Sequence, residues 1–398
     1  MSWVDLVVIG LAVIAAVSGW RHGMAVAALS FVGVLGGAII GVRIAPVLAS
    51  GIESQSTRII VSIAVVVLLV ALGETTGVFL GRRIRDRITG ERVLAVDSTL
   101  GSILQAITVV LAAWLVALPL ASASFPALAA GVRGSEVLRA VDGVMPEGAK
   151  ELPDELRKLL DNSGFPDVLS PFAETPITDI GPPNVALAKS PAVKLVGPSV
   201  MKVRAKAPSC QRQMEGTGFV IGPRLIMTNA HVVAGSSSAL VEATGGRDLP
   251  ADVVYYDPRI DLAVLRVGRA LGADALQFEP TPAKAGDDAI VLGYPLDGDF
   301  TVTPARVRQN IKLKGPDIYE SGEVVRDVLT VRAKVQSGNS GGPMIDPAGK
   351  VTGVVFGAAV DDSETGFVLS VDQVTPAVQK ALALGDSPPE VQTGSCAA

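Results

Sequence analysis

Three segments between residues 216 and 344 carry side chains that could together perform nucleophilic acyl transfer. His231 lies in the segment MTNAHVV, Asp261 follows the turn DPRI, and Ser340 lies in the glycine-rich segment QSGNSGGPM. A serine hydroxyl becomes a good nucleophile when an adjacent imidazole removes its proton, and a buried carboxylate holds that imidazole in the required tautomer. The pattern therefore predicts Ser340 as nucleophile, His231 as base and Asp261 as the residue that orients the base.

The glycines around Ser340 fit the same chemistry. An oxyanion formed during attack needs donors that are already aimed at it, and backbone N–H groups usually supply them. Glycine lets the backbone turn tightly without a Cβ in the way. We therefore expect the N–H groups of Gly338 and Ser340 to form the oxyanion hole.

Each of the three residues has a purely structural alternative. Ser340 could be an ordinary turn serine, and His231, one of only two histidines in the chain, could be a hydrogen-bonded core residue. Asp257 competes with Asp261 for the orienting role. Because Asp257 precedes a proline it suits a turn cap, whereas Asp261 opens an apolar run, so Asp261 is favoured.

The elements that must position these residues are predicted to be strands. Short runs rich in β-branched residues alternate with Gly, Pro and Asp turns, which is typical of an all-β barrel or sandwich. Clear examples are residues 218–221, 262–267, 289–292 and 351–356, followed by a final helix over about 374–384. We therefore expect residues 201–398 to be one all-β catalytic domain.

The N-terminal part of the chain is much more apolar. The composition is 49% hydrophobic with a mean hydropathy of +0.45, which indicates that part of the chain lies in lipid. Four stretches have the length of a membrane span, namely residues 4–20, 24–42, 59–80 and 99–120. Residues 1–121 are therefore predicted to be a bundle of four transmembrane helices.

Basic residues set the expected orientation of the four spans. The loop between the third and fourth spans should be cytoplasmic, since it carries Arg82, Arg83, Arg85, Arg87 and Arg92. Four spans then place both termini, and with them the catalytic domain, outside the cytoplasm as part of a multi-pass cell-membrane protein, with the catalytic domain in the periplasm. The net charge of −5 offers no basic surface for nucleic acid, and no motif indicates a cofactor or a metal.

Two features of the spans have open alternatives. Gly33, Gly37 and Gly41 form one smooth helix face, which suits either packing within this bundle or contact with a second copy. Glu74 lies within the third span, where a carboxylate is costly and often functional. It could also reach the interface or pair with an arginine, so the sequence leaves a transport role open.

Residues 122–200 are predicted to be a proline-rich extracytoplasmic linker. Its prolines prevent a long helix or a central strand, although one amphipathic helix fits between residues 146 and 162. Such a tether offers exposed sites for cleavage, including self-cleavage. Cys210 and Cys396 are the only cysteines, and outside the cytoplasm they are expected to form a disulfide, with two free buried thiols as the alternative.

The motifs resemble those of known families. The order His, Asp, Ser and the segments TNAHVV, DLAVL and GNSGGP resemble chymotrypsin-like serine proteases, most closely the HtrA/Deg branch. The four glycine-rich spans resemble the colicin V production family, and the whole arrangement resembles membrane-anchored acid-resistance proteases of actinobacteria. The resemblance implies a chymotrypsin-like double barrel and a serine endopeptidase that cleaves envelope proteins in acid or envelope stress. The alternative is a membrane transport or secretion factor with an accessory protease domain.

Two consequences qualify the resemblance. Many secreted trypsin-like enzymes have an aspartate before the serine that pairs with a new N-terminus, but here this residue is Asn339, so activation by N-terminal insertion is not expected. An imidazole must be neutral to act as a base, and its reference pKa is about 6.5. We therefore expect any acid response to act through substrate exposure or a conformational change and not through faster chemistry.

Overall fold

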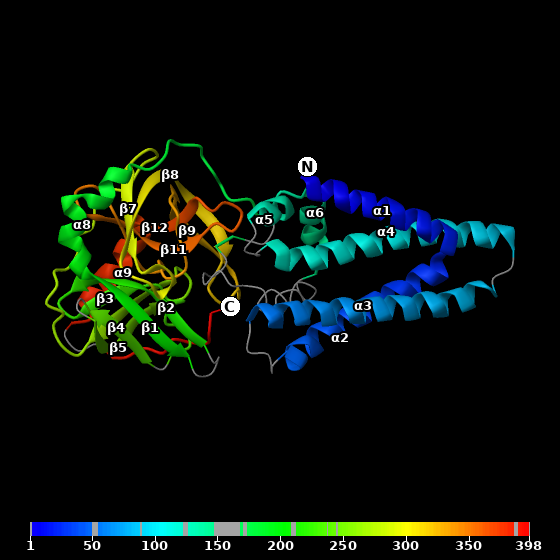
Figure 1. The fold of residues 1–398 in the computed structure, drawn as a ribbon, viewed down its shortest axis with the longest axis horizontal. Coiled ribbons are helices and arrows are strands. Elements are labelled where there is room, and N and C mark those ends of the chain that lie inside the picture. Colours follow the sequence, from blue (N-terminus) through cyan, green and yellow to red (C-terminus); the bar gives the residue numbers. More distant parts are fainter. Residues whose placement is uncertain are drawn as a thin grey trace. The chain divides into compact units, whose positions relative to one another are not determined.

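The computed structural model describes most of the chain, in two compact units that span Met1–Asn162 and Ser163–Ala398 (Figure 1). The described residues are 2–49, 55–87, 90–121, 126–146, 168–169, 173–207, 212–236, 238–243, 246–385 and 389–397. The first unit is helical and the second is built from β-strands. Each unit is considered by itself below.

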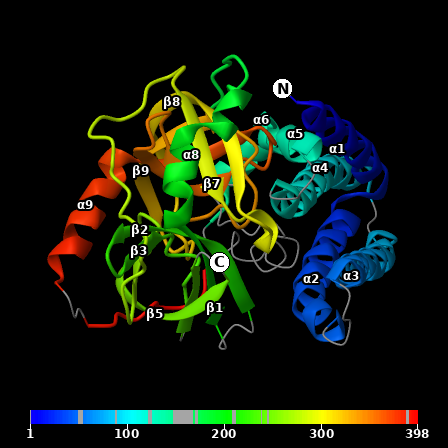
Figure 2. The same cartoon turned by 60° about the vertical axis from the view of Figure 1, so that its left-hand side comes forward.

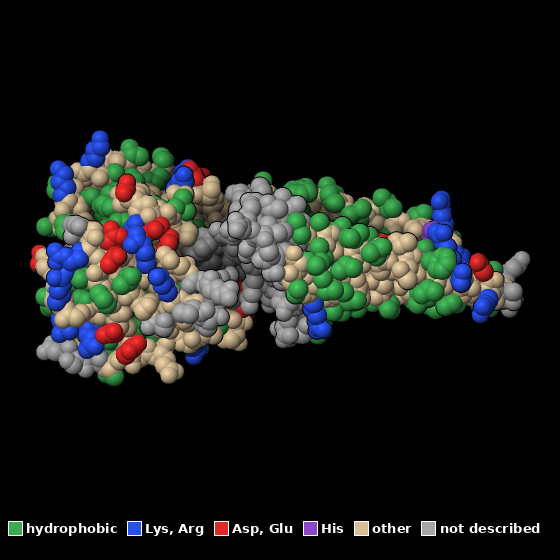
Figure 3. All heavy atoms as spheres, turned by 60° about the horizontal axis from the view of Figure 1, so that its bottom comes forward, with side chains coloured by type: hydrophobic (Ala, Val, Ile, Leu, Met, Phe, Trp, Pro, Cys, Tyr) green, Lys and Arg blue, Asp and Glu red, His purple; other side chains and the backbone are tan. Residues whose placement is uncertain are grey.

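The helical unit contains the four apolar helices that the sequence predicts. They are α1 (Trp3–His22), α2 (Met24–Ala49), α3 (Gln55–Arg85) and α4 (Glu91–Ala121). Each includes a stretch long and apolar enough to cross a membrane. Hydrophobic side chains cover much of the visible face of this unit, and Lys and Arg gather at one end of it (Figure 3).

Two shorter helices extend the helical unit beyond the four spans. They are α5 (Pro126–Arg133) and α6 (Glu136–Val144), and both pack against α1 and α4. The predicted linker begins at residue 122, so these helices fall inside it. No proline separates Pro126 from Pro146, and Ser135 caps the first turn of α6 by accepting a hydrogen bond from the N–H of Leu138. The chain therefore stays in the helical unit well past the fourth span.

The glycine face of α2 packs against α3 within the same bundle. A Cβ at Gly33 would collide with the carbonyl of Gly73, and one at Gly37 would collide with that of Leu69. Small residues at these positions let the two backbones approach closely. The glycine face therefore packs within this bundle, which is the first of the two alternatives given for it above.

Two buried carboxylates of the helical unit, those of Asp5 and Asp97, hold helix ends. The buried carboxylate of Asp5 accepts hydrogen bonds from Ser135 Oγ at 2.5 Å and from the N–H of Val137 at 3.1 Å, so it joins α1 to α6. Asp97 accepts from the N–H of Met24 at 3.0 Å and so holds the start of α2. The side chain of Glu74 is exposed on α3.

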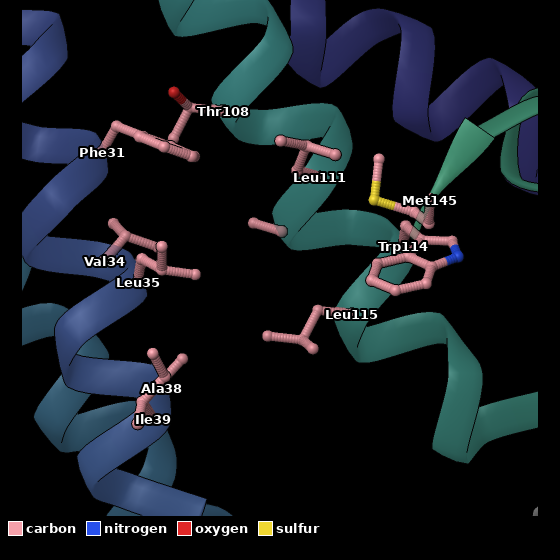
Figure 4. Close-up of a pocket in the computed structure, with 11 residues that line it drawn as sticks. Phe31, Val34, Leu35, Ala38, Ile39, Thr108, Leu111, Trp114, Leu115 and Met145 are labelled. Carbon is pink, nitrogen blue, oxygen red and sulfur yellow. The ribbon is translucent and has the colours of Figure 1, made fainter. Parts of the chain in front are cut away.

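An apolar pocket lies between α2 and α4 (Figure 4). Phe31 and Leu35 line it from α2, and Leu111 and Trp114 line it from α4. The indole Nε1 of Trp114 donates to Asp142 Oδ1 at 3.1 Å, which ties this wall of the pocket to α6. The lining offers hydrophobic contact and little polar chemistry.

The second unit consists of two closed antiparallel barrels, which confirms the double barrel that the resemblance to chymotrypsin-like proteases implies. The first contains β1 (Val200–Ala207), β2 (Arg212–Gly222), β3 (Leu225–Thr228), β4 (Ser238–Ala243), β5 (Arg247–Asp257) and β6 (Leu262–Val267). The second contains β7 (Asp288–Gly293), β8 (Thr301–Pro316), β9 (Glu323–Arg332), β10 (Pro343–Ile345), β11 (Val351–Ala358) and β12 (Thr365–Ser370). A final helix, α9 (Val371–Ala383), packs on β9, β11 and β12 (Figure 2).

Each barrel has its own core, and a third apolar cluster joins the two barrels. Ile226 and Leu265 lie in the core of the first barrel, while Val291 and Leu329 lie in that of the second. The joining cluster includes the large buried side chains of Phe219, Leu262, Leu292 and Phe356. Because strand side chains alternate between faces, a strand at the contact between the barrels, such as β6, fills its own barrel with one face (Leu265) and the joining cluster with the other (Leu262, Val264).

Part of the predicted linker packs on the second barrel. Before β1, the chain forms the short helices η1 (Val185–Lys189), α8 (Pro191–Val196) and η2 (Gly197–Ser199). Ahead of these, Arg308 donates to the carbonyl of Thr178 at 2.8 Å, and Arg332 donates to that of Ile180 at 2.9 Å. Proline prevents regular ladders but not such contacts. The amphipathic helix predicted for residues 146–162 lies almost entirely outside the described residues.

Candidate active site

Strand pairing brings His231 and Asp261 together. His231 lies in the turn after β3, Asp261 directly precedes β6, and Thr228 of β3 pairs with Ala263 of β6. The Nδ1 atom of His231 lies 2.7 Å from Oδ2 of Asp261, and the backbone N–H of His231 donates to Oδ1 at 2.9 Å. Both carboxylate oxygens therefore hold the same residue, and Asp261 is fully buried.

Asn229 holds the backbone of Asp261, a contact that the sequence analysis did not identify. Asp261 has a φ of 62°, a left-handed conformation that is uncommon outside glycine and costs energy unless neighbouring groups support it. The buried Asn229 Nδ2 donates to the carbonyl of Asp261 at 2.7 Å. Its place two residues before His231 was the available signal, but a contact across two strands is not visible in the motif.

Asp257, the competing carboxylate, has a different environment. Its Oδ1 accepts from the N–H of Arg259 at 3.1 Å and from that of Ile260 at 3.3 Å. These bonds close the turn that leads to Asp261. Asp257 thus caps the turn, and within the described part of the chain it forms no hydrogen bond or ion pair with His231.

The turn that carries Ser340 is fixed by its own carbonyl groups. The carbonyl of Ser337 accepts from the N–H of Leu296 at 2.7 Å, and that of Asn339 accepts from the N–H of Gly342 at 2.9 Å. Because a trans peptide places its N–H opposite its carbonyl, the next N–H in each case, that of Gly338 and that of Ser340, points away from these bonds. In the described part of the chain neither N–H has an acceptor.

Thr217 of β2 secures the same turn from the first barrel. Its buried Oγ1 donates to the carbonyl of Gly338 at 2.6 Å, and its backbone N–H donates to the carbonyl of Ser340 at 2.7 Å. Asn339 is also buried, and its Oδ1 accepts from the N–H of Gln336 at 3.0 Å. An amide therefore stabilises this turn from within, in place of the charged aspartate of enzymes that insert a new N-terminus.

Two reactive atoms remain unpaired. Ser340 Oγ and His231 Nε2 are both buried, and neither has a hydrogen-bond partner among the described residues. A buried polar atom without a partner costs free energy in a site built only for stability. In unliganded proteases the bond between serine and histidine is often long and tightens when substrate binds.

Other polar groups interact electrostatically with Asp261. Tyr256 and Tyr319 share a hydrogen bond of 2.6 Å between their hydroxyls. Burial, this bond and the charge of Asp261 raise the pKa of Tyr256, so the hydroxyl stays protonated and neutral. Burial lowers the pKa of Arg326 although the charge of Asp261 opposes this shift, and its guanidinium donates to the carbonyls of Arg259 and Pro316.

Comparison with known proteins places the chain in a family. The serine protease Rv3671c of Mycobacterium tuberculosis (strain H37Rv) is 48% identical over 397 residues, which cover 99% of this chain and 98% of the relative. The chain belongs to the Rv3671c serine protease family. The crystal structure of the Rv3671c protease in its active form is 51% identical, covers 58% of this chain and all of that chain, and superimposes with a TM-score of 0.54.

Both units of this Rv3671c family member also match broader families. Residues 216–354 match the trypsin-like peptidase domain, and residues 4–146 match the colicin V production protein, a range that includes α5 and α6. A probable periplasmic serine endoprotease of Bartonella henselae, described as DegP-like, is 31% identical over 175 residues, which cover 43% of this chain and 34% of the relative. The chain is thus an HtrA-related serine endopeptidase and a multi-pass membrane protein.

The C-terminal tail of this family member contacts the turn that follows His231. The N–H of Gly235 donates to the carbonyl of Thr393 at 3.1 Å, and Thr393 Oγ1 donates to the carbonyl of Ser236 at 2.9 Å. Cys396 is disulfide-bonded in this tail. Its predicted partner, Cys210, lies outside the described residues.

Proposed function

We propose that Ser340, His231 and Asp261 form the catalytic triad. His231 Nε2 takes the proton of Ser340 Oγ as this oxygen attacks the substrate carbonyl, and then gives it to the leaving amine. Asp261 holds the ring and stabilises its protonated form. Water repeats the sequence on the acyl-enzyme and releases the acid product. The observation that carries this proposal is the 2.7 Å contact between His231 and Asp261, with Nε2 and Ser340 Oγ left unpaired.

The N–H groups of Gly338 and Ser340 complete the proposed mechanism. They bind the oxyanion of the tetrahedral intermediate, where one such donor contributes about 10²- to 10³-fold to kcat. Their freedom from other acceptors supports this role. The carbonyls of Ser337 and Gly338 each accept a hydrogen bond, from the N–H of Leu296 and from Thr217 Oγ1, and these bonds keep the peptides on either side of Gly338 from rotating.

The proposed substrates are proteins of the cell envelope, cleaved during acid or envelope stress. The arginines at the end of α3, Arg82, Arg83 and Arg85, favour a cytoplasmic end for that helix. Four spans then direct the protease unit outward, as the description "periplasmic" of the Bartonella relative also suggests for this class. Self-cleavage in the predicted linker would release the protease unit, and a bond between Cys210 and Cys396 would tie the tail to the start of that unit.

One experiment tests both the chemistry and the orientation. The full chain would be expressed in a bacterial membrane and treated with a membrane-impermeant fluorophosphonate, with Ser340→Ala as the matched control. We expect labelling of the wild type in spheroplasts, loss of labelling in sealed inside-out vesicles, and none in the variant. Labelling that persists in Ser340→Ala would refute the triad. Labelling confined to inside-out vesicles would refute the orientation.

A further inference from the structure

A strained turn lies against the peptide that supplies the first oxyanion donor. The short helix η4 (Pro295–Asp297) follows β7, and within it Leu296 and Asp297 have φ angles of 55° and 53°. Two successive non-glycine residues in the left-handed region are costly, so other contacts must hold them. The Leu296 side chain is 69% exposed, so its contacts with the rest of the fold are made mainly by its backbone.

Two basic residues of the first barrel hold this turn. On β1, Lys202 Nζ lies 3.0 Å from Asp297 Oδ1 and also donates to the Asp297 carbonyl at 2.7 Å. Arg204 Nη2 lies 3.2 Å from the same carboxylate oxygen. The Lys202 side chain is only 10% exposed and lies over the ring of Tyr294, 5.4 Å from its centre. A mostly buried ammonium that makes two contacts with one residue holds that residue more firmly than a solvent-exposed ion pair does.

Lys202 is the more specific of the two cations. Arg204 also contacts Glu242 at 3.0 Å and Asp248 at 3.8 Å, so its charge is shared among three carboxylates. Burial alone would raise the pKa of Asp297, but the hydrogen bonds and charges of Lys202 and Arg204 outweigh it and lower that pKa. The carboxylate therefore stays ionised in mildly acidic surroundings.

The turn controls the orientation of one peptide in the active site. The N–H of Leu296 donates to the carbonyl of Ser337 at 2.7 Å, and this carbonyl belongs to the same peptide as the Gly338 N–H. If the peptide rotated, its carbonyl would replace the N–H as the group directed toward the oxyanion. A Cβ at Gly338 would collide with the carbonyl of Tyr294, which shows how closely the turn covers this peptide.

We propose that Lys202 and Asp297 are positioning residues for proteolysis: their ion pair fixes the η4 turn, whose Leu296 N–H in turn orients the Gly338 oxyanion donor. This role rests on the proposed function of Gly338. The pair connects β1 of the first barrel to a loop of the second, so docking of the two barrels also sets the oxyanion hole. Neither residue touches substrate, and their loss should affect the transition state more than substrate binding.

The test uses the full chain in detergent with the variants Lys202→Met and Asp297→Asn. We expect kcat on a peptide amide to fall about 10- to 100-fold, part of what one lost oxyanion donor costs, with little change in KM. The inhibition constant of a matching peptide aldehyde, whose adduct needs the oxyanion hole, should rise by a similar factor. The double variant should be no worse than either single one, because both changes release the same turn.

Controls separate positioning from general stability. Asp252→Asn and Arg266→Met remove an exposed pair of the same barrel, 3.1 Å apart, and should leave kcat and aldehyde affinity unchanged. Melting temperatures of all variants are measured alongside. Unchanged kcat in Asp297→Asn, or losses of kcat that follow melting temperature in the controls as well, would overturn the positioning role. If the wild type shows no hydrolysis that depends on Ser340, the proposed function itself has failed.

Discussion

Two aspartates, Asp5 in the helical unit and Asp261 in the protease unit, are equally buried but bind different kinds of hydrogen-bond donor. Both are fully buried, and both use their two carboxylate oxygens as acceptors. The partners of Asp5 are a hydroxyl and backbone N–H groups at the N-terminal ends of two helices. Its negative charge therefore caps these helices and pairs with no reactive group. The partners of Asp261 are the backbone N–H and the imidazole of His231, and the second nitrogen of that imidazole has no partner among the described residues.

The difference shows which observation marks chemistry in this chain. Burial of a carboxylate is common to structural and catalytic sites, so burial alone identifies neither. Unpaired buried polar atoms such as Ser30 Oγ also occur in the helical unit, but in the protease unit two of them, Ser340 Oγ and His231 Nε2, belong to a possible nucleophile and base, and the N–H groups of Gly338 and Ser340 have no acceptor among the described residues. Such atoms are costly unless a substrate pairs with them. Three substitutions can break or sharpen this comparison.

The largest effect is expected from Asp261→Asn. An asparagine at this position would donate to His231 Nδ1 and stabilise the wrong tautomer, so kcat/KM should fall about 10⁴-fold. Because the volume is unchanged, the melting temperature should move little. Steady-state hydrolysis of a peptide amide by the full chain measures the loss.

Asp257→Asn is the matched control, since Asp257 caps the neighbouring turn and does not contact His231. It should change kcat/KM by less than about threefold, the range of substitutions that remove no functional contact. A larger loss in Asp257→Asn than in Asp261→Asn would mean that the wrong carboxylate has been assigned.

An intermediate effect is expected from Asn229→Ala. The change removes the donor that holds the carbonyl of Asp261 in its left-handed conformation. A lost buried hydrogen bond costs about 1–3 kcal/mol, and about 1.4 kcal/mol of it expressed in the transition state lowers kcat/KM about tenfold. Combining it with Asp261→Asn should add little, because both act through the same ring.

Asn310→Ala, at an exposed position on β8, serves as the control for Asn229. Full additivity of Asn229→Ala with Asp261→Asn would show that Asn229 acts elsewhere. In that case the strained conformation of Asp261 would depend on other contacts, and the comparison with Asp5 would lose one of its supports.

The sequence predicted those parts of the site that lie within short continuous motifs. His231, Asp261 and Ser340 lie in short motifs, hydropathy predicted the four long helices, and β-branched runs between Gly, Pro and Asp turns predicted an all-β domain. The supporting contacts were not predictable, because they join residues far apart in the chain. Asn229 and Asp261 are 32 residues apart, Lys202 and Asp297 are 95 apart, and Thr217 and Gly338 are 121 apart. Periodicity and motif spacing report on neighbours, whereas these contacts depend on barrel closure.

The smallest effect on activity is expected from Asp5→Asn. The amide can accept at only one atom, so with its nitrogen in the place of Oδ2 the N–H groups of Ser2 and Glu136 both lose their acceptor, and the capping charge is removed. The free energy of unfolding of the helical unit should fall by about 1–3 kcal/mol, seen as a lower melting temperature of helical circular dichroism in detergent. Glu74→Gln, at an exposed position on α3, should leave it unchanged. Peptide hydrolysis should stay at the wild-type rate in both variants, since neither side chain belongs to the protease unit. A loss of kcat in Asp5→Asn without unfolding would contradict this expectation and show that the buried carboxylates of the two units are functionally coupled.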